Sequence, residues 1–137
     1  MTTSISGGCA CGAIRYVCKS EPLAMLNCHC RDCQQSSGAP FASGIIVATA
    51  SLEISGTPTT YAVRGSSGNL TRRSFCGRCG TPLFTVGEVN PQLMSIRFSS
   101  LDDGSGFRPA LDIWTSRAQQ WVCFDPSIPH YPQSPQQ

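Results

Sequence analysis

Seven of the nine cysteines fall into three short clusters whose spacing suits metal binding. The clusters are Cys9-Ala10-Cys11-Gly12, Cys28-His29-Cys30-Arg31-Asp32-Cys33 and Cys76-Gly77-Arg78-Cys79-Gly80. Two thiolates separated by two residues form a tight turn around one ion, and a glycine such as Gly80 relieves strain where the chain turns back. Because the cysteine count is high and odd, bound metal explains these thiols better than a set of paired disulfides.

The first and third clusters together supply four sulfurs, which is enough to complete one tetrahedral zinc site. Cys9 and Cys11 would provide two of them, and Cys76 and Cys79 the other two. In small zinc modules such a site contributes on the order of 10 kcal/mol to the free energy of folding, which is comparable to the whole stability of a domain of this size. The alternative, that these thiols are ordinary small core residues, fits the regular spacing less well.

The central cluster supplies only three sulfurs, those of Cys28, Cys30 and Cys33. It therefore predicts a second zinc ion whose fourth position is open to water, a thiol or a substrate, as in catalytic zinc sites. The alternative is a second structural zinc with His29 as the fourth ligand. His29 stands between two of the proposed ligands, and on a strand its side chain would point away from both.

Other residues with reactive side chains follow no such pattern. Asp32 and Glu21 are candidates for proton transfer beside an open zinc site, although an isolated carboxylate is more often a solvated surface group. Cys18 and Cys123 stand beside apolar residues, and we expect both to be buried free thiols. The segment 65–68 is rich in glycine and serine but lacks the lysine and the following helix of a nucleotide-binding loop.

The elements that position these clusters are predicted to be short strands. The chain's 13 glycines and 10 prolines recur at short intervals, which breaks up long helices and favours strands joined by turns. Apolar or alternating runs predict strands over 14–18, 24–28, 41–48, 52–54, 59–63, 70–75, 81–86 and 93–98. Helical turns are predicted only over 31–35 and 116–120. The fold class is all-β, a single domain of short antiparallel strands.

The length and charge of the chain indicate its domain organisation and exclude some classes of function. A chain of 137 residues suits one domain with one core, which we place at 1–125, followed by a Pro/Ser/Gln-rich surface tail at 126–137. The net charge is only +2 and the basic residues are scattered, so nucleic-acid binding is unsupported. Neither a membrane span nor a signal peptide is recognisable, and we expect a cytoplasmic protein. Whether it forms a homo-oligomer stays open.

The three cysteine motifs together resemble the glutathione-dependent formaldehyde-activating enzyme family, whose members share a zinc-stapled β fold, the β-tent. The resemblance is carried by residues 7–16 (GGCACGAIRY), 27–34 (NCHCRDCQ) and 75–81 (FCGRCGT), in that order and at wide spacing. It implies a structural zinc on Cys9, Cys11, Cys76 and Cys79 and a catalytic zinc on Cys28, Cys30 and Cys33. It also implies a carbon-sulfur lyase that acts on the glutathione adduct of formaldehyde, or on a related thiol adduct of another small aldehyde.

The resemblance also implies that some residues bind glutathione. This tripeptide carries two carboxylates, which arginine side chains bind bidentately, and the candidates are Arg31, Arg72, Arg73 and Arg78. Taken singly, each of these arginines is more often a solvated surface charge than a ligand-binding residue. Gln35 and Asp112 stand where many members carry a basic residue and a histidine, so the thiol and aldehyde that the protein accepts are not determined.

A second function class is a zinc-stabilised binding or scaffold module without catalytic activity. The resemblance of centromere protein V to the same family would permit it. We expect scaffold members to add basic or proline-rich extensions for their partners, whereas here little lies outside the domain except a short uncharged tail. The sequence therefore favours the enzyme.

Overall fold

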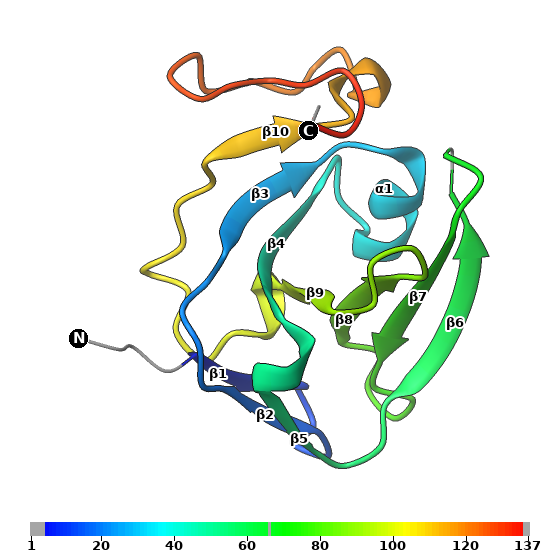
Figure 1. Cartoon of the computed structure of the whole chain (residues 1–137), viewed down its shortest axis with the longest axis vertical. Coiled ribbons are helices and arrows are strands. Elements are labelled where there is room, and N and C mark those ends of the chain that lie inside the picture. The colour runs from blue at the N-terminus through cyan, green and yellow to red at the C-terminus, as the bar shows by residue number, and fades with distance from the viewer. Residues whose placement is uncertain (1–4, 66, 136–137) are drawn as a thin grey trace.

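Two β-sheets and one short α-helix make up the part of the chain that the structure, a computed structural model, describes: residues 5–65 and 67–135 (Figure 1). The smaller sheet has the strand order β1-β2-β5, and the larger has the order β10-β3-β4-β9-β8-β7-β6. The strands of the smaller sheet are β1 (Ile5–Gly8), β2 (Arg15–Cys18) and β5 (Leu52–Ser55). Those of the larger sheet are β3 (Ala24–Cys28), β4 (Ala42–Ala48), β6 (Thr59–Arg64), β7 (Leu70–Phe75), β8 (Pro82–Gly87), β9 (Leu93–Arg97) and β10 (Leu111–Ile113).

The all-β class predicted from the sequence is confirmed, and the strand pairing is antiparallel with one exception. β6 to β9 form an antiparallel meander, whereas the short β10 pairs with β3 in parallel. The sequence patterns did not predict β1 or β10. β1 consists of Ile-Ser-Gly-Gly, which has little intrinsic strand preference, and it is a strand because its residues pair with β2.

The single helix, α1 (Arg31–Ser37), follows directly after β3 and is longer than the predicted helical turn. The sulfur of Cys30 caps its N-terminus by accepting a hydrogen bond from the Cys33 amide (3.3 Å). Gly38 ends it in the left-handed region at φ +68°, which costs glycine little, and its amide donates to the Gln34 carbonyl (3.0 Å). The predicted turn at 116–120 is a three-residue 3-10 helix, Thr115–Arg117.

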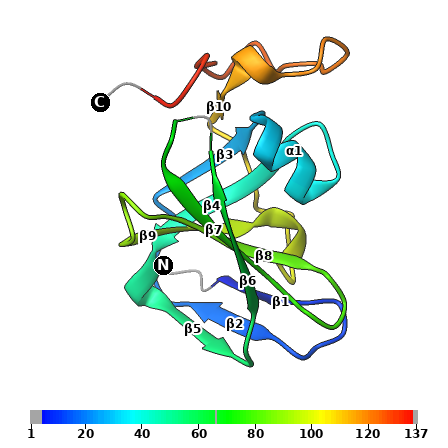
Figure 2. The ribbon, with the colours of Figure 1, turned by 90° about the vertical axis from the view of Figure 1, so that its right-hand side faces the viewer.

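The segment after β10 returns along the outer edge of the larger sheet (Figures 1 and 2). The Asp112 amide donates to the Pro129 carbonyl (3.0 Å), and the Tyr131 amide donates to the Asp112 carbonyl (2.9 Å). Figure 2 shows the smaller sheet at the opposite end of the molecule. The proline-rich tail is thus hydrogen-bonded to the sheet edge, and a domain boundary at 125 stays a prediction. No helix within the described ranges is long and apolar enough to cross a membrane.

Tyr16 joins the two sheets in the core. Its side chain is fully buried, its ring meets Phe84 edge to face with 5.1 Å between centroids, and its hydroxyl lies 2.7 Å from the Ser100 hydroxyl. Ser100 donates its own proton to the Arg97 carbonyl (2.8 Å), so Tyr16 is the donor of this pair. The hydrogen bond therefore links the smaller sheet to the turn that follows β9.

We expect Tyr16→Phe to lower the free energy of unfolding by about 1 kcal/mol, because a buried hydrogen bond is lost while the ring packing is kept. Urea denaturation followed by fluorescence measures the change. The control is Tyr61→Phe, since Tyr61 is 62% exposed and its hydroxyl should not affect stability. Equal stability of the Tyr16 variant and the unmodified protein would contradict this account of the sheet contact.

Candidate metal centres

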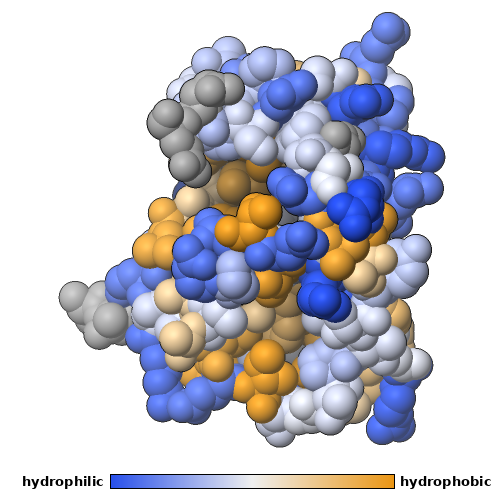
Figure 3. All heavy atoms as spheres, turned by 45° about the vertical axis from the view of Figure 1, so that its right-hand side comes forward, coloured by the Kyte–Doolittle hydropathy of each residue, from blue (hydrophilic) through white to orange (hydrophobic). Residues whose placement is uncertain are grey.

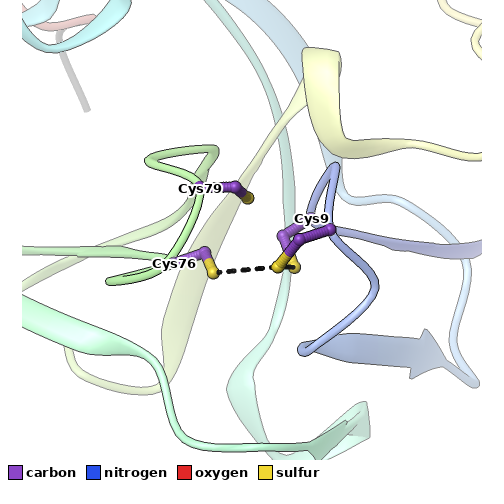
Figure 4. Close-up of side chains that lie close together, drawn as sticks. Cys9, Cys76 and Cys79 are labelled. Atoms are coloured by element: carbon purple, nitrogen blue, oxygen red, sulfur yellow. Dashed lines mark hydrogen bonds between the residues drawn. The ribbon is translucent and has the colours of Figure 1, made fainter.

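Four cysteine sulfurs from distant parts of the chain meet beside the smaller sheet. Cys9 and Cys11 lie in the loop after β1, and Cys76 and Cys79 lie in the turn between β7 and β8 (Figure 4). Cys9 Sγ lies 3.6 Å from Cys11 Sγ, Cys11 Sγ lies 3.7 Å from Cys76 Sγ, and all four sulfurs are within 4.8 Å of one another. Because zinc-sulfur bonds are 2.3 Å long, a tetrahedral ion separates its ligands by about 3.8 Å. The four sulfurs therefore fit a zinc ion.

The local backbone of both loops turns amide groups toward these sulfurs. The Ile14 amide donates to Cys9 Sγ (3.2 Å), and the Arg78 amide donates to Cys76 Sγ (3.4 Å). The turn closes through Gly80, which adopts φ +81° and donates to the Cys76 carbonyl (2.8 Å). Such donors favour thiolates, the form in which cysteine binds metal.

Thr81 connects the two loops at this centre. Its hydroxyl accepts a hydrogen bond from the Ala10 amide (3.0 Å) and lies 3.2 Å from Cys79 Sγ. Hydrogen bonds from the Thr81 side chain, followed by those from the Thr81 and Cys11 backbones, lower the pKa of Cys79 to about 5. Cys11 and Cys79 are exposed, so the alternative of ordinary core thiols does not account for them.

The central cysteines form a second group of three sulfurs within 4.8 Å of one another. Cys28 is the last residue of β3, Cys30 caps α1, and Cys33 lies in the first turn of α1. Across residues 5–65 and 67–135, no further histidine, cysteine or carboxylate ligand atom joins this group. The donor set therefore fits a zinc ion with three protein ligands and one free position.

The three central thiols share their protons unequally. Hydrogen bonds to Cys30 and Cys33 raise the pKa of Cys28, because they hold its proton in place. Hydrogen bonds from Cys28 and Cys30 lower the pKa of Cys33 to about 2, and the charges of Arg73 and Arg97 lower it further. Metal binding would therefore release protons from this group.

His29 does not join the central cysteines, and the geometry does not support it as a fourth ligand. Its Nε2 lies 2.9 Å from Asp112 Oδ1, and its ring is 1% exposed between Phe41 and Phe124, with 4.9 Å between centroids on either side. Asp112 Oδ2 also lies 3.5 Å from His130 Nε2. The imidazole thus fastens β3 to β10 and to the C-terminal segment.

We expect Asp112→Ala to lower the free energy of unfolding by about 3 kcal/mol, because it leaves the buried His29 without its partner. Chemical denaturation measures this loss. The metal content should stay unchanged, which separates this effect from damage to the cysteine groups. A loss of metal without a loss of stability would instead place His29 at the metal.

Arg73 and Arg97 reach the central cysteines from the larger sheet. Arg73 on β7 directs Nη2 to Cys33 Sγ (3.9 Å) and donates from Nη1 to Ser36 Oγ (3.1 Å). Arg97 at the end of β9 donates from Nη2 to the same Ser36 Oγ (2.6 Å) and is only 5% exposed. Burial lowers the pKa of Arg97. Ser36 thus ties both guanidinium groups to α1.

Sequence reasoning missed Arg97. It alternates with Met94 and Ile96 along its strand and therefore looked like a solvent-facing residue. The sequence feature that could have indicated its role is the position of a charged residue at the end of a largely apolar strand.

The other predicted arginines lie apart from the two that meet Ser36. Arg31 donates to Gln34 Oε1 (3.2 Å) on α1. Arg72 is exposed and, as the neighbour of Arg73 on one strand, faces the opposite side of the sheet. Arg78 lies in the turn that carries the four-sulfur group. A role of these three residues in ligand binding stays a prediction.

Two predictions about single residues can be compared with the structure. Cys18 is buried, as expected, with its sulfur 3.3 Å from Ser51 Oγ. Cys123, in contrast, is exposed, and the prediction of a buried thiol was wrong. Its apolar neighbour Val122 suggested burial, but the residue lies in an irregular segment outside the sheets.

Glu21 and Asp32 lie in different surroundings. Glu21 lines a separate cavity of about 420 Å³ together with Met25 and Phe107. None of the central cysteines lines this cavity. Asp32 is partly exposed in the first turn of α1, next to Cys33 in the chain. Neither of the two predicted carboxylates joins the three-sulfur group, and Asp32 is its neighbour only along the chain.

The fold and the two sulfur groups define a small β protein built around two candidate metal centres. The chain belongs to the glutathione-dependent formaldehyde-activating enzyme family, whose model matches residues 4–117. A protein of Halomonas elongata named "Putative glutathione-dependent formaldehyde-activating enzyme" is 27% identical over 103 residues. That match covers 72% of this chain and 66% of the relative, so the chain spans slightly less than two thirds of the relative's length.

A solved structure has the same fold. The crystal structure of a Rhodobacter sphaeroides protein matches with a TM-score of 0.56 and 18% sequence identity, over 91% of this chain and 98% of that one. At this identity the similarity concerns the fold alone.

Proposed function

We propose that this protein is a zinc-dependent carbon-sulfur lyase that joins glutathione to formaldehyde, or to a related small aldehyde, and cleaves the same adduct in reverse. The observation that carries the proposal is the three-sulfur group of Cys28, Cys30 and Cys33, which has no fourth side-chain ligand within the described residues. Family membership supports the thiol and the aldehyde. The four-sulfur group would hold a second, structural zinc.

The reaction requires a deprotonated thiol close to a carbonyl carbon. The sulfur-carbon bond forms as the carbonyl electron pair moves to oxygen, which takes up a proton, while the thiol gives up its own. Zinc held by the central cysteines would supply Lewis acidity and keep an added thiol deprotonated at neutral pH. The protein's part is to hold the two reactants in contact, which accounts for much of the rate gain in such condensations.

The side chains around the central cysteines support this task. Arg73, 3.9 Å from Cys33 Sγ, places a positive charge beside the thiolates and offsets part of their negative charge. The Cys33 amide holds Cys30 Sγ at the start of α1, which fixes the position of that ligand. Arg73 is also the predicted arginine best placed to meet a carboxylate of glutathione.

Cobalt replacement tests the proposal. Cobalt binds to the same ligands as zinc, and its thiolate-to-metal absorption reports on the number of bound sulfurs. Titration of the cobalt-loaded protein with glutathione should increase this absorption. In a separate assay, the zinc-loaded protein should consume formaldehyde in the presence of glutathione. An unchanged spectrum at saturating glutathione would favour a closed metal site and a scaffold function.

A further inference from the structure

The cavity of about 420 Å³ that Glu21 lines is bounded by several separate parts of the chain. Its described wall comes from β1, from the turn before β3, from β3 and β4, and from the segment 101–107 between β9 and β10. Figure 1 shows this segment in yellow at the left, beside β1 and β3. No cysteine is among the described lining residues, so the cavity is separate from both sulfur groups.

The inner wall of the cavity is apolar and continuous with the core. Ile45 on β4 is 2% exposed and belongs to the core cluster, and Met25 and Phe107 pack against that cluster. Hydrophobic side chains also reach the surface in small patches between hydrophilic residues (Figure 3), but scattered patches of this kind are ordinary on a protein. The cavity differs because it is concave, so a ligand can remove apolar surface from water on more than one side.

The charged part of the lining is acidic. It contains the carboxylates of Glu21, Asp102 and Asp103, and within the described residues no lysine, arginine or histidine lines the cavity. Asp102 is already paired, because Arg15 Nη1 donates to its Oδ1 (2.9 Å) and the Ser6 hydroxyl donates to its Oδ2 (2.9 Å). The charge of Asp102 is therefore balanced inside the protein.

Asp103 carries a charge that is available to a ligand. Its Oδ1 accepts a hydrogen bond from the Ser105 amide (3.0 Å), which lowers the pKa of Asp103 and keeps the carboxylate ionised at neutral pH. No ion pair to Asp103 occurs in residues 5–65 and 67–135. Arg108 lies outside the lining, and its Nη1 donates to the carbonyls of Ser105 (3.1 Å) and Phe107 (2.8 Å). The Asp103 carboxylate is thus fixed in place and ready to meet a cation.

The apolar wall and the carboxylate together select a ligand by charge and by shape. A protonated amine would face Asp103, while an apolar body attached to it would lie on Met25, Ile45 and Phe107. A hydrated metal ion would leave the apolar wall unused, and an anionic molecule would be repelled by the carboxylates. The volume lies at the lower end of the range for small-molecule sites, which suits a ligand about the size of a single aromatic ring with a short substituent.

We propose that this cavity is a second ligand site, which binds a small primary amine with an apolar body. The ammonium group meets Asp103, and the apolar body lies against Met25, Ile45 and Phe107. The site shares no residue with either sulfur group, so amine binding is independent of the proposed lyase reaction. Because the cavity exists only in the folded protein, a bound amine should also raise the melting temperature.

Three probes separate the effect of charge from that of apolar contact. They are benzylamine, benzyl alcohol, which has the same ring without the charge, and methylamine, which has the charge without the ring. NMR titration of the zinc-loaded full chain, with the Met25 methyl signal as local reporter, should give benzylamine an affinity about 5-fold higher than that of either other probe. This factor corresponds to about 1 kcal/mol, the upper end for an exposed ion pair, and the advantage over benzyl alcohol should shrink at high salt. Equal affinities, or an unshifted Met25 signal, would overturn the proposal.

The cobalt-loaded protein shows whether the amine binds at the central cysteines instead. Benzylamine at saturation should leave the thiolate-to-cobalt absorption unchanged. A changed spectrum together with an unshifted Met25 signal would place the amine at the metal and overturn the proposal. Titration of the same protein with glutathione tests the proposed function separately.

Asp103→Asn is the discriminating variant. Asparagine keeps the side-chain oxygen that accepts from the Ser105 amide, so the free energy of unfolding should stay the same, whereas the preference for benzylamine over benzyl alcohol should fall about threefold. The matched control is Asp125→Asn, because Asp125 Oδ1 accepts from the Ser127 amide in the same way (2.8 Å) but lies outside the cavity lining. The control should keep the full preference. An Asp103 variant that also keeps it would overturn the proposal.

Discussion

Cys76→Ser is expected to leave the protein unfolded at room temperature and without the metal that we propose for the four-sulfur group. The four-sulfur group ties the loop after β1 to the β7–β8 turn, and the sulfurs of Cys11 and Cys76 are 65 positions apart in the chain. Zinc binding of this kind contributes on the order of 10 kcal/mol, as much as the net stability of a typical domain. Circular dichroism and metal analysis of the purified variant measure the effect.

The matched control is Cys123→Ser, which removes an exposed thiol outside both sulfur groups. This variant should keep the circular dichroism spectrum, the metal content and the melting temperature of the unmodified protein. A chelator added to the unmodified protein should reproduce the unfolding of the Cys76 variant. A Cys76 variant that melts like the control would mean that the fold does not depend on this metal.

The second large effect is expected from Cys30→Ser, which should abolish the thiol-dependent activity while the protein stays folded. Two ligands bind zinc far less securely than three, so the central metal should be lost and the metal content should fall from two ions per chain to one. Serine caps helices well, so it can replace Cys30 as acceptor for the Cys33 amide, and α1 should be preserved. The glutathione-induced change in the cobalt spectrum should disappear.

Two results would contradict this division of roles between the sulfur groups. One is a Cys30 variant that unfolds like the Cys76 variant, which would make the central metal structural. The other is a Cys30 variant that retains full activity, which would place the chemistry elsewhere. Cys123→Ser again serves as the control for the loss of a thiol.

Two strands of the larger sheet, β4 and β7, were predictable because their local patterns agree with their environment. β4 and β7 fall at 42–48 and 70–75, within or at the predicted ranges, and both carry alternating or apolar runs. β1 and β10 were not predictable in this way. β10 has three residues, and it is a strand because β3 and the C-terminal segment lie beside it. Pairing partners decide the structure of such short segments.

The grouping of the cysteines was also accessible from the sequence. Ligands two or three positions apart are brought together by one tight turn or the first turn of a helix, so their spacing contains the necessary information. The exposure of Cys123 could not be predicted from the sequence, since apolar neighbours in an irregular segment do not ensure contact with the core.

The amino-acid sequence by itself determined the all-β class, the family and the three short cysteine clusters, because these depend on composition and short-range spacing. The meeting of the first and third clusters in one set of four sulfurs, which the sequence only suggested, depends on the tertiary structure. Only the tertiary structure decided that His29 turns to Asp112, and that Arg73 and Arg97 meet at Ser36. Those contacts join residues from distant parts of the chain. They depend on strand order and register, which arise from packing of the whole chain and not from any local pattern.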